Sequence, residues 1–172
     1  STYGDRRHAD RKQRIEQLGV VLTRALADRG KIFIPAFALG RTQELIYEMD
    51  RLFTDPRYRE MFPDLQDQQH PPVFVDSPLG LKITRIYARL ADYWDTEARD
   101  LEQRGDHPID FRGLYAVENH RDHLKLCDSS GPAVILAGSG MCTGGRIVDH
   151  LQQGIEQPAN DILFVGYQAA GT

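Results

Sequence analysis

The apolar positions of the chain follow two patterns that alternate along its length. In residues 10–28, hydrophobic side chains recur every three or four positions, which predicts an amphipathic helix that ends near Gly30. Residues 31–35 follow as a short run that is apolar after Lys31, which is typical of a buried strand. Residues 54–72 are rich in Pro, Asp and Gln, and are predicted to form a loop with short helical pieces.

The same alternation continues to the end of the chain. Further strands are predicted at residues 73–75, 114–117, 133–137 and 161–165, and further helices at residues 42–53, 78–93, 95–104, 121–127 and 145–153. Short, continuously apolar strands separated by helices are typical of a parallel sheet that is covered on both faces. The sequence therefore predicts an α/β fold, a three-layer sandwich with a mostly parallel sheet and helices on both faces.

Composition and charge narrow the class of protein. With 41% hydrophobic and 27% charged residues, the chain has the balance of one globular domain, and no apolar run is long enough to predict a transmembrane helix. The net charge of −4 argues against a general nucleic-acid binder, although residues 1–59 carry a local excess of Lys and Arg. Cys127 and Cys142 lack the spacing of a zinc site and are expected to be reduced thiols in a cytoplasmic protein.

Both ends of the sequence are expected to be cuts in a longer polypeptide. The chain starts at Ser1 without an initiating Met or a signal peptide, and it stops at Thr172 shortly after a predicted strand. Residues 1–172 are therefore expected to form a single domain of a larger protein.

Three loops that leave predicted strands carry the residues best suited to binding. They are residues 35–44, 76–79 and 137–146, and ligands of open parallel sheets bind at such carboxyl ends of strands. The third loop holds four glycines, which allow close approach of a ligand, and it precedes a helix start that favours a phosphate. Arg146 adds a guanidinium that can bind phosphate with two N–H groups. A plain strand-to-helix turn accounts equally well for the glycines.

The other two loops allow more than one interpretation. Arg41 precedes a predicted helix and is a second candidate for phosphate binding. Asp76 and Ser77 end a predicted strand, where they either take part in a site or cap the next helix.

A dinucleotide fingerprint is a competing interpretation of the third loop. Gly138, Gly140 and Gly144 resemble G-x-G-x-x-G, but the third glycine comes one residue too late, and no acidic residue follows the next strand to bind a ribose. A stand-alone Rossmann-like nucleotide-binding domain is therefore the alternative function, and a protein-interaction module is a third.

The histidines do not form a recognised metal motif. His120 and His123 lie three positions apart on a predicted helix, but neither H-x-H-x-D-H nor H-E-x-x-H occurs in the sequence. No Ser-His-Asp arrangement is indicated either. These residues and His150 are expected to be exposed or locally hydrogen-bonded.

Five segments, taken together and in order, resemble the β-CASP domain that is inserted in nucleases of the metallo-β-lactamase fold. They are STYGDR at 1–6, PAFALGRTQE at 35–44, VDSPL at 75–79, GSGMCTGGR at 138–146 and LFVGYQAAGT at 163–172. The resemblance spans the whole chain, and it is strongest to prokaryotic relatives of the endonuclease subunit that cleaves pre-mRNA at its 3′ end. It implies a Rossmann-like fold.

The resemblance also implies an activity for the parent protein. Such proteins hydrolyse RNA, in processing or decay, with two zinc ions, and the RNA runs between the β-CASP domain and the metallo-β-lactamase domain. The family's first acidic residue would precede Ser1, and its later histidines would follow Thr172. No catalytic or metal-binding residue therefore carries over, no cofactor is expected in this chain, and the chain alone is expected to be inactive.

What carries over is the wall of the substrate cleft, so that the chain is interpreted as an RNA-binding lid. The matching residues are Ser139, Gly140, Met141, Thr143, Gly144, Gly145 and Arg146, with Arg41, Asp76 and Ser77 as weaker candidates on neighbouring loops. The expected partners are RNA and the chain's own metallo-β-lactamase domain. Phe37 and Met141 are candidates for an apolar face that would also support a homodimer, and no membrane partner is expected.

Overall fold

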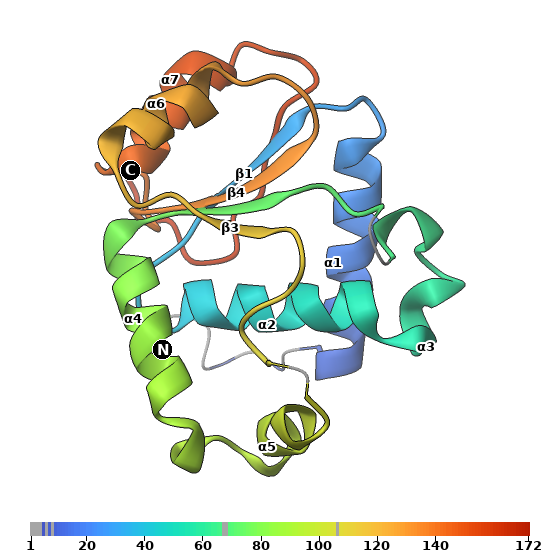
Figure 1. Cartoon of the computed structure of the whole chain (residues 1–172). Helices are drawn as coiled ribbons and strands as arrows, with labels where there is room; N and C mark the ends of the chain where they lie inside the picture. Colours follow the sequence, from blue (N-terminus) through green and yellow to red (C-terminus); the bar gives the residue numbers. More distant parts are fainter. Residues whose placement is uncertain (1–4, 6, 8, 67–68, 106) are drawn as a thin grey trace.

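A five-stranded parallel sheet forms the middle layer of the molecule, with helices on both faces (Figure 1). The computed structural model describes residues 5, 7, 9–66, 69–105 and 107–172, so the segment STYGDR lies largely outside the described residues. The strand order is β3-β2-β4-β1-β5, and every pair in it is parallel. The predicted three-layer α/β class is confirmed.

The elements of the described chain follow the predicted alternation. The helices are α1 (Arg11–Leu26), α2 (Arg41–Thr54), α3 (Pro56–Arg59), α4 (Pro78–Arg89), α5 (Thr96–Gln103), α6 (His120–Asp128) and α7 (Arg146–Gly154), with 3₁₀ turns η1 (Pro63–Leu65) and η2 (Ala91–Tyr93). The strands are β1 (Lys31–Pro35), β2 (Val73–Asp76), β3 (Leu114–Ala116), β4 (Ala133–Ala137) and β5 (Asp161–Ile162). β5 is shorter than predicted because it lies at the edge of the sheet and pairs with β1 through two residues.

Each face of the sheet has its own hydrophobic cluster. Helices α6 and α7 pack on one face, where Phe33 and Ile135 meet Ile147 of α7. Helices α1, α2 and α4 lie on the other face, where Ile34 and Val134 belong to the larger cluster. Successive side chains of a strand point to opposite faces, so both sets of side chains are buried in a strand covered on both sides, as they are in β1 and β4.

The carboxyl ends of three neighbouring strands lie side by side. Pro35 at the end of β1 is in register with Ala137 at the end of β4, and Asp76 at the end of β2 is in register with the same Ala137. The loops that follow these strands therefore meet at one edge of the sheet, as predicted from the sequence.

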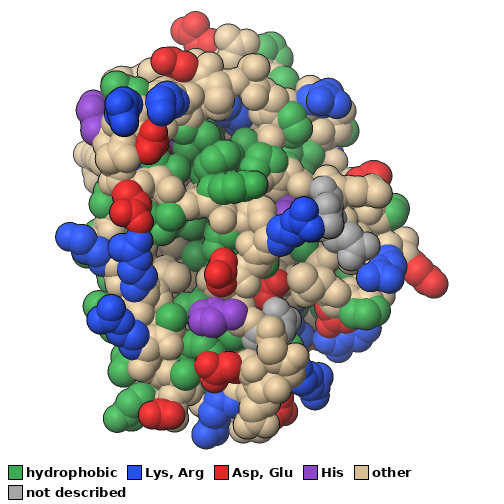
Figure 2. Space-filling model, viewed as in Figure 1, with side chains coloured by type: hydrophobic (Ala, Val, Ile, Leu, Met, Phe, Trp, Pro, Cys, Tyr) green, Lys and Arg blue, Asp and Glu red, His purple; other side chains and the backbone are tan. Residues whose placement is uncertain are grey.

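The surface seen in Figure 2 carries no single sign of charge. Lys, Arg, Asp and Glu side chains are intermixed around a group of hydrophobic side chains near the middle of this face. Among the described residues, no helix is long and apolar enough to cross a membrane.

Candidate functional site

The glycine loop, residues 138–145, connects β4 to α7 at the carboxyl edge of the sheet. It folds back on itself, because the N–H of Ser139 donates to the carbonyl of Gly144 at 3.0 Å. Gly145 has a φ angle of 77°, and a Cβ atom there would lie 2.5 Å from the carbonyl oxygen of Gly138. Glycine is therefore required at the position where the loop enters the helix.

Helix α7 begins without a side-chain cap. Its N-cap residue is Gly145, which offers no side chain to the N–H groups of the first turn. The hydroxyl groups of Ser139 and Thr143 lie 3.4 Å apart in the same loop. No described atom lies within 4 Å of a Cβ built at Gly144, so this position faces open space. The N–H of Ile147 in the first turn already donates to the carbonyl of Gly138 at 2.9 Å, so the hydroxyls of Ser139 and Thr143 are the side-chain donors that this open loop offers an anion.

Two other segments hold the glycine loop in place. The ring of Phe37, in the loop after β1, lies against Gly140, where an added Cβ would come within 2.8 Å of it. The side-chain amide of Gln168 donates to the carbonyl of Gly140 at 2.7 Å. Phe37 remains 47% exposed. Three of the segments that carry the β-CASP resemblance thus meet at one place.

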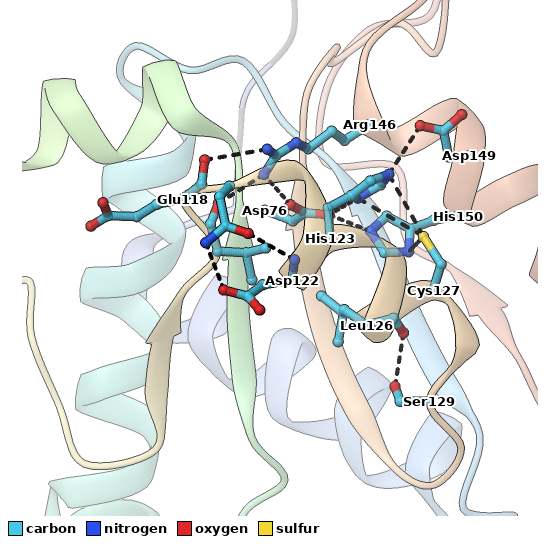
Figure 3. A network of polar contacts seen from close by, with 12 residues as sticks. Asp76, Glu118, Asp122, His123, Leu126, Cys127, Ser129, Arg146, Asp149 and His150 are labelled. Atoms are coloured by element: carbon cyan, nitrogen blue, oxygen red, sulfur yellow. Dashed lines mark hydrogen bonds and ion pairs between the residues drawn. The ribbon is translucent and has the colours of Figure 1, made fainter.

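Beneath the glycine loop, the carboxylate of Asp76 accepts hydrogen bonds from three side chains (Figure 3). Its Oδ2 atom accepts from Nδ1 of His123 and from Nε2 of His150, both at 2.6 Å, and its Oδ1 atom accepts from Arg146 at 2.6 Å. Asp76 is fully buried. Burial alone would raise the pKa of Asp76, but the hydrogen bonds from His150, His123 and Arg146 outweigh it and hold this pKa below its usual value.

Arg146 points inward from the first turn of α7. Besides Asp76, its Nη1 atom donates to the carbonyl of Val117 at 2.8 Å, and its Nη2 atom to the carbonyl of Glu118 at 3.3 Å. The guanidinium thereby connects α7 to the ends of β2 and β3. In the structure, the guanidinium of Arg146 is hydrogen-bonded to other residues of the chain. A contact between Arg146 and phosphate stays a prediction.

The remaining predicted residues lie at or near the same edge. Ser77 is buried, and its hydroxyl caps α4 by accepting from the N–H of Gly80 at 3.1 Å, so the capping interpretation holds for Ser77. Arg41 begins α2 and forms an ion pair with Glu44 at 2.6 Å. Met141 is partly buried within the glycine loop. The binding roles of all these residues remain predictions.

Sequence reasoning missed a buried cluster of His123, Cys127 and His150. The Cys127 sulfur lies 3.4 Å from Nδ1 of His150, and all three residues are buried. The expectation of locally hydrogen-bonded histidines is confirmed for His123 and His150, whereas His120 is exposed and stacks on His123. The available signal was the four-residue spacing of His123 and Cys127, which places both on one face of α6.

Replacement of Asp76 by Asn should strongly destabilise the fold. Arg146 would lose its buried charge partner, and an amide NH₂ would face ring N–H groups, so we expect a loss of about 3–5 kcal/mol in the free energy of unfolding. Urea denaturation of Asp76→Asn measures this loss. The matched control is Asp64→Asn at an exposed position, which should unfold like the wild type. Equal stability of Asp76→Asn and the control would contradict a central role for Asp76.

The sequence of the chain is similar to a known family and to known proteins. The model of the Beta-Casp domain family matches residues 42–172. The chain is 36% identical over 170 residues to ribonuclease TTHA0252 of Thermus thermophilus, covering 99% of this chain and 37% of that protein. It is 32% identical over 175 residues to transcription termination factor FttA of Methanocaldococcus jannaschii, covering 100% of this chain and 26% of that protein.

A eukaryotic protein is also similar. Endoribonuclease YSH1 of Yarrowia lipolytica is 30% identical over 173 residues, covering 100% of this chain and 19% of that protein. The chain therefore spans little more than a third, or less, of the length of these relatives. The family model covers most of the chain and includes the loops around Asp76 and Arg146, so the resemblance found in the sequence is confirmed. The chain belongs to the β-CASP domain family.

Proposed function

We propose that this chain is the RNA-binding lid domain of a metal-dependent ribonuclease that acts in RNA processing or decay. The observation that carries the proposal is the similarity over 99% of the chain to a protein named as a ribonuclease. A second relative is named as an endoribonuclease. A stand-alone nucleotide-binding domain is not favoured, since the glycine loop belongs to a β-CASP domain.

The glycine loop supplies the physical means of binding. An RNA strand presents phosphate oxygens, which accept hydrogen bonds from backbone N–H groups and hydroxyls. The hydroxyls of Ser139 and Thr143 are donors of this kind on one open loop that leads into α7. The exposed ring of Phe37 beside Gly140 adds a surface on which a base can stack.

In this proposal Arg146 positions the glycine loop, whereas from the sequence we expected it to bind phosphate directly. Its bonds to Asp76 and to the carbonyl of Val117 fix the direction in which α7 meets the glycine loop. It acts on RNA through the position of the loop, and its positive charge offsets the buried carboxylate beneath the bound phosphate.

The two zinc ions implied for the parent enzyme do not fit the described residues of this chain. The H-x-H-x-D-H motif is absent from the sequence, and the cluster of His123, Cys127 and His150 offers too few ligands for two ions. We propose that the parent's metallo-β-lactamase domain, as the partner of this chain, holds those ions. The role of this chain is to bind and orient the RNA strand.

Two further expectations accompany the proposal. A cytoplasmic location is supported by Cys127 and Cys142, both of which are free thiols. A homodimer through the exposed Phe37 stays a prediction.

A negative charge on the glycine loop should weaken RNA binding. In Gly144→Asp, a carboxylate would stand in open space beside the bound phosphate, and repulsion of about 1 kcal/mol should lower the affinity about fivefold. Fluorescence anisotropy with a labelled single-stranded RNA at fixed salt measures this affinity. Gly144→Asn is the matched control, because it has nearly the same shape without the charge. Equal affinities of the two variants would place the RNA elsewhere.

The purified 172-residue chain should not cleave RNA, because none of the family's catalytic residues carries over onto it. Incubation of a labelled RNA with the chain and Zn²⁺, followed by electrophoresis, should show intact RNA. Cleavage that a chelator abolishes would contradict the proposal that the chemistry belongs to another domain.

A further inference from the structure

The hydrogen bonds of Asp76 determine which nitrogens of two histidines carry a proton. A carboxylate can only accept, so Nδ1 of His123 and Nε2 of His150 must both donate to it. In a neutral imidazole the opposite nitrogen then carries a lone pair. These lone-pair nitrogens are Nε2 of His123 and Nδ1 of His150, and both point away from Asp76.

The lone-pair nitrogens face other metal-ligating atoms. Nδ1 of His150 lies 3.4 Å from the Cys127 sulfur. Nε2 of His123 lies 3.8 Å from the same sulfur and 3.0 Å from Oδ2 of Asp149. A nitrogen lone pair and a carboxylate are both acceptors. The approach of Nε2 of His123 to Oδ2 of Asp149 therefore requires a proton or a metal ion between the two atoms.

We propose that His123, Cys127 and His150, with Asp149 as the fourth ligand, bind one divalent cation of the zinc class. The ligand atoms of the three buried residues lie within 4.8 Å of one another. Bond lengths of about 2.0 Å to nitrogen and about 2.3 Å to sulfur place tetrahedral ligand atoms roughly 3.5 Å apart, close to the two sulfur–nitrogen separations above. A ligand set of thiolate and imidazole selects zinc over magnesium or calcium.

Asp76 completes this site without touching the ion. Histidines that bind metals usually donate their second ring N–H to a carboxylate, which fixes the tautomer and the orientation of the ring. Here a single carboxylate does so for both histidines, as Figure 3 shows. Asp76 is held in turn by Arg146, whose bond at 2.6 Å joins the proposed site to the start of α7.

Cys127 is better suited to this role than to nucleophilic catalysis. Burial raises the pKa of the Cys127 thiol to about 11, so the thiol without a metal keeps its proton at neutral pH. A thiol that stays protonated is a poor nucleophile, whereas a metal ion displaces the proton and binds the thiolate.

The cluster borders a cavity on the side of Cys127 and His150. A cavity of about 350 Å³ is lined by Cys127 and His150, together with Lys31, Gly131 and Asn160. With four protein ligands the site would be closed, as structural zinc sites are, and it would join α6 to α7. The inference does not depend on RNA binding.

Metal binding to the chelator-treated 172-residue chain tests the proposal. We expect one Zn²⁺ per chain, a raised melting temperature, and a Co²⁺ derivative with the visible spectrum of a tetrahedral site and a thiolate-to-cobalt charge-transfer band. Cys127→Ser should lose this band and bind zinc at least about tenfold more weakly. Asp149→Ala, at a half-exposed side chain, should also weaken zinc binding.

Cys142→Ser is the matched control, and it identifies the ligand even if Cys127→Ser does not fold. Cys127 is then the single remaining cysteine of the chain, so the charge-transfer band must persist in Cys142→Ser. Loss of the band in Cys142→Ser would overturn the proposal, as would a wild-type chain that binds neither ion. Zinc affinity that is unchanged in both Cys127→Ser and Asp149→Ala would overturn it as well.

Discussion

The arrangement at the carboxyl edge of the sheet depends on one buried carboxylate, that of Asp76. A buried charge without partners costs several kcal/mol, so the fold must bring donors to it. These donors come from two helices, His123 from α6 and both Arg146 and His150 from α7. The same three bonds therefore fix how both helices of one face sit against the end of β2.

Arg146 links the buried carboxylate of Asp76 to the glycine loop at the surface. The guanidinium lies between the buried carboxylate and the carbonyls that follow β3, so the first turn of α7 cannot rotate without breaking these bonds. The glycine loop ends at that turn, and Phe37 and Gln168 hold its middle. The glycine loop, held in place in this way, is the part of the chain that we propose to contact RNA.

Much of the fold could be predicted from the sequence because its strands are buried on both faces. Residues 32–35 and 133–137 are apolar at successive positions, and the strands 31–35 and 133–137 were predicted with the bounds that the structure has. The strand predicted at residues 161–165 ends earlier in the structure, at Ile162. Residues 163–165 are also apolar, but β5 lies at the edge of the sheet and pairs with β1 through two residues only. Apolar residues in a sequence indicate that a segment is buried. Whether that segment pairs as a strand depends on its position in the sheet.

The site could be predicted only in part. The loops could be placed at one edge, since the carboxyl ends of parallel strands always meet there. The partner of Arg146 depends on the order of the strands, because β2 must lie beside β4 before Asp76 can reach α7. The cluster around Cys127 depends in addition on α6 and α7 covering the same face, which no local pattern reveals.

The most direct test of the central role of Asp76 is the protonation pattern of two histidine rings. Long-range ¹H–¹⁵N NMR of the chain with ¹⁵N-labelled histidine assigns a proton to each ring nitrogen. The structure predicts a proton on Nδ1 of His123 and on Nε2 of His150, both protected from exchange with water by burial. A lone pair on either of these nitrogens would contradict the account, because that ring could not donate to Asp76.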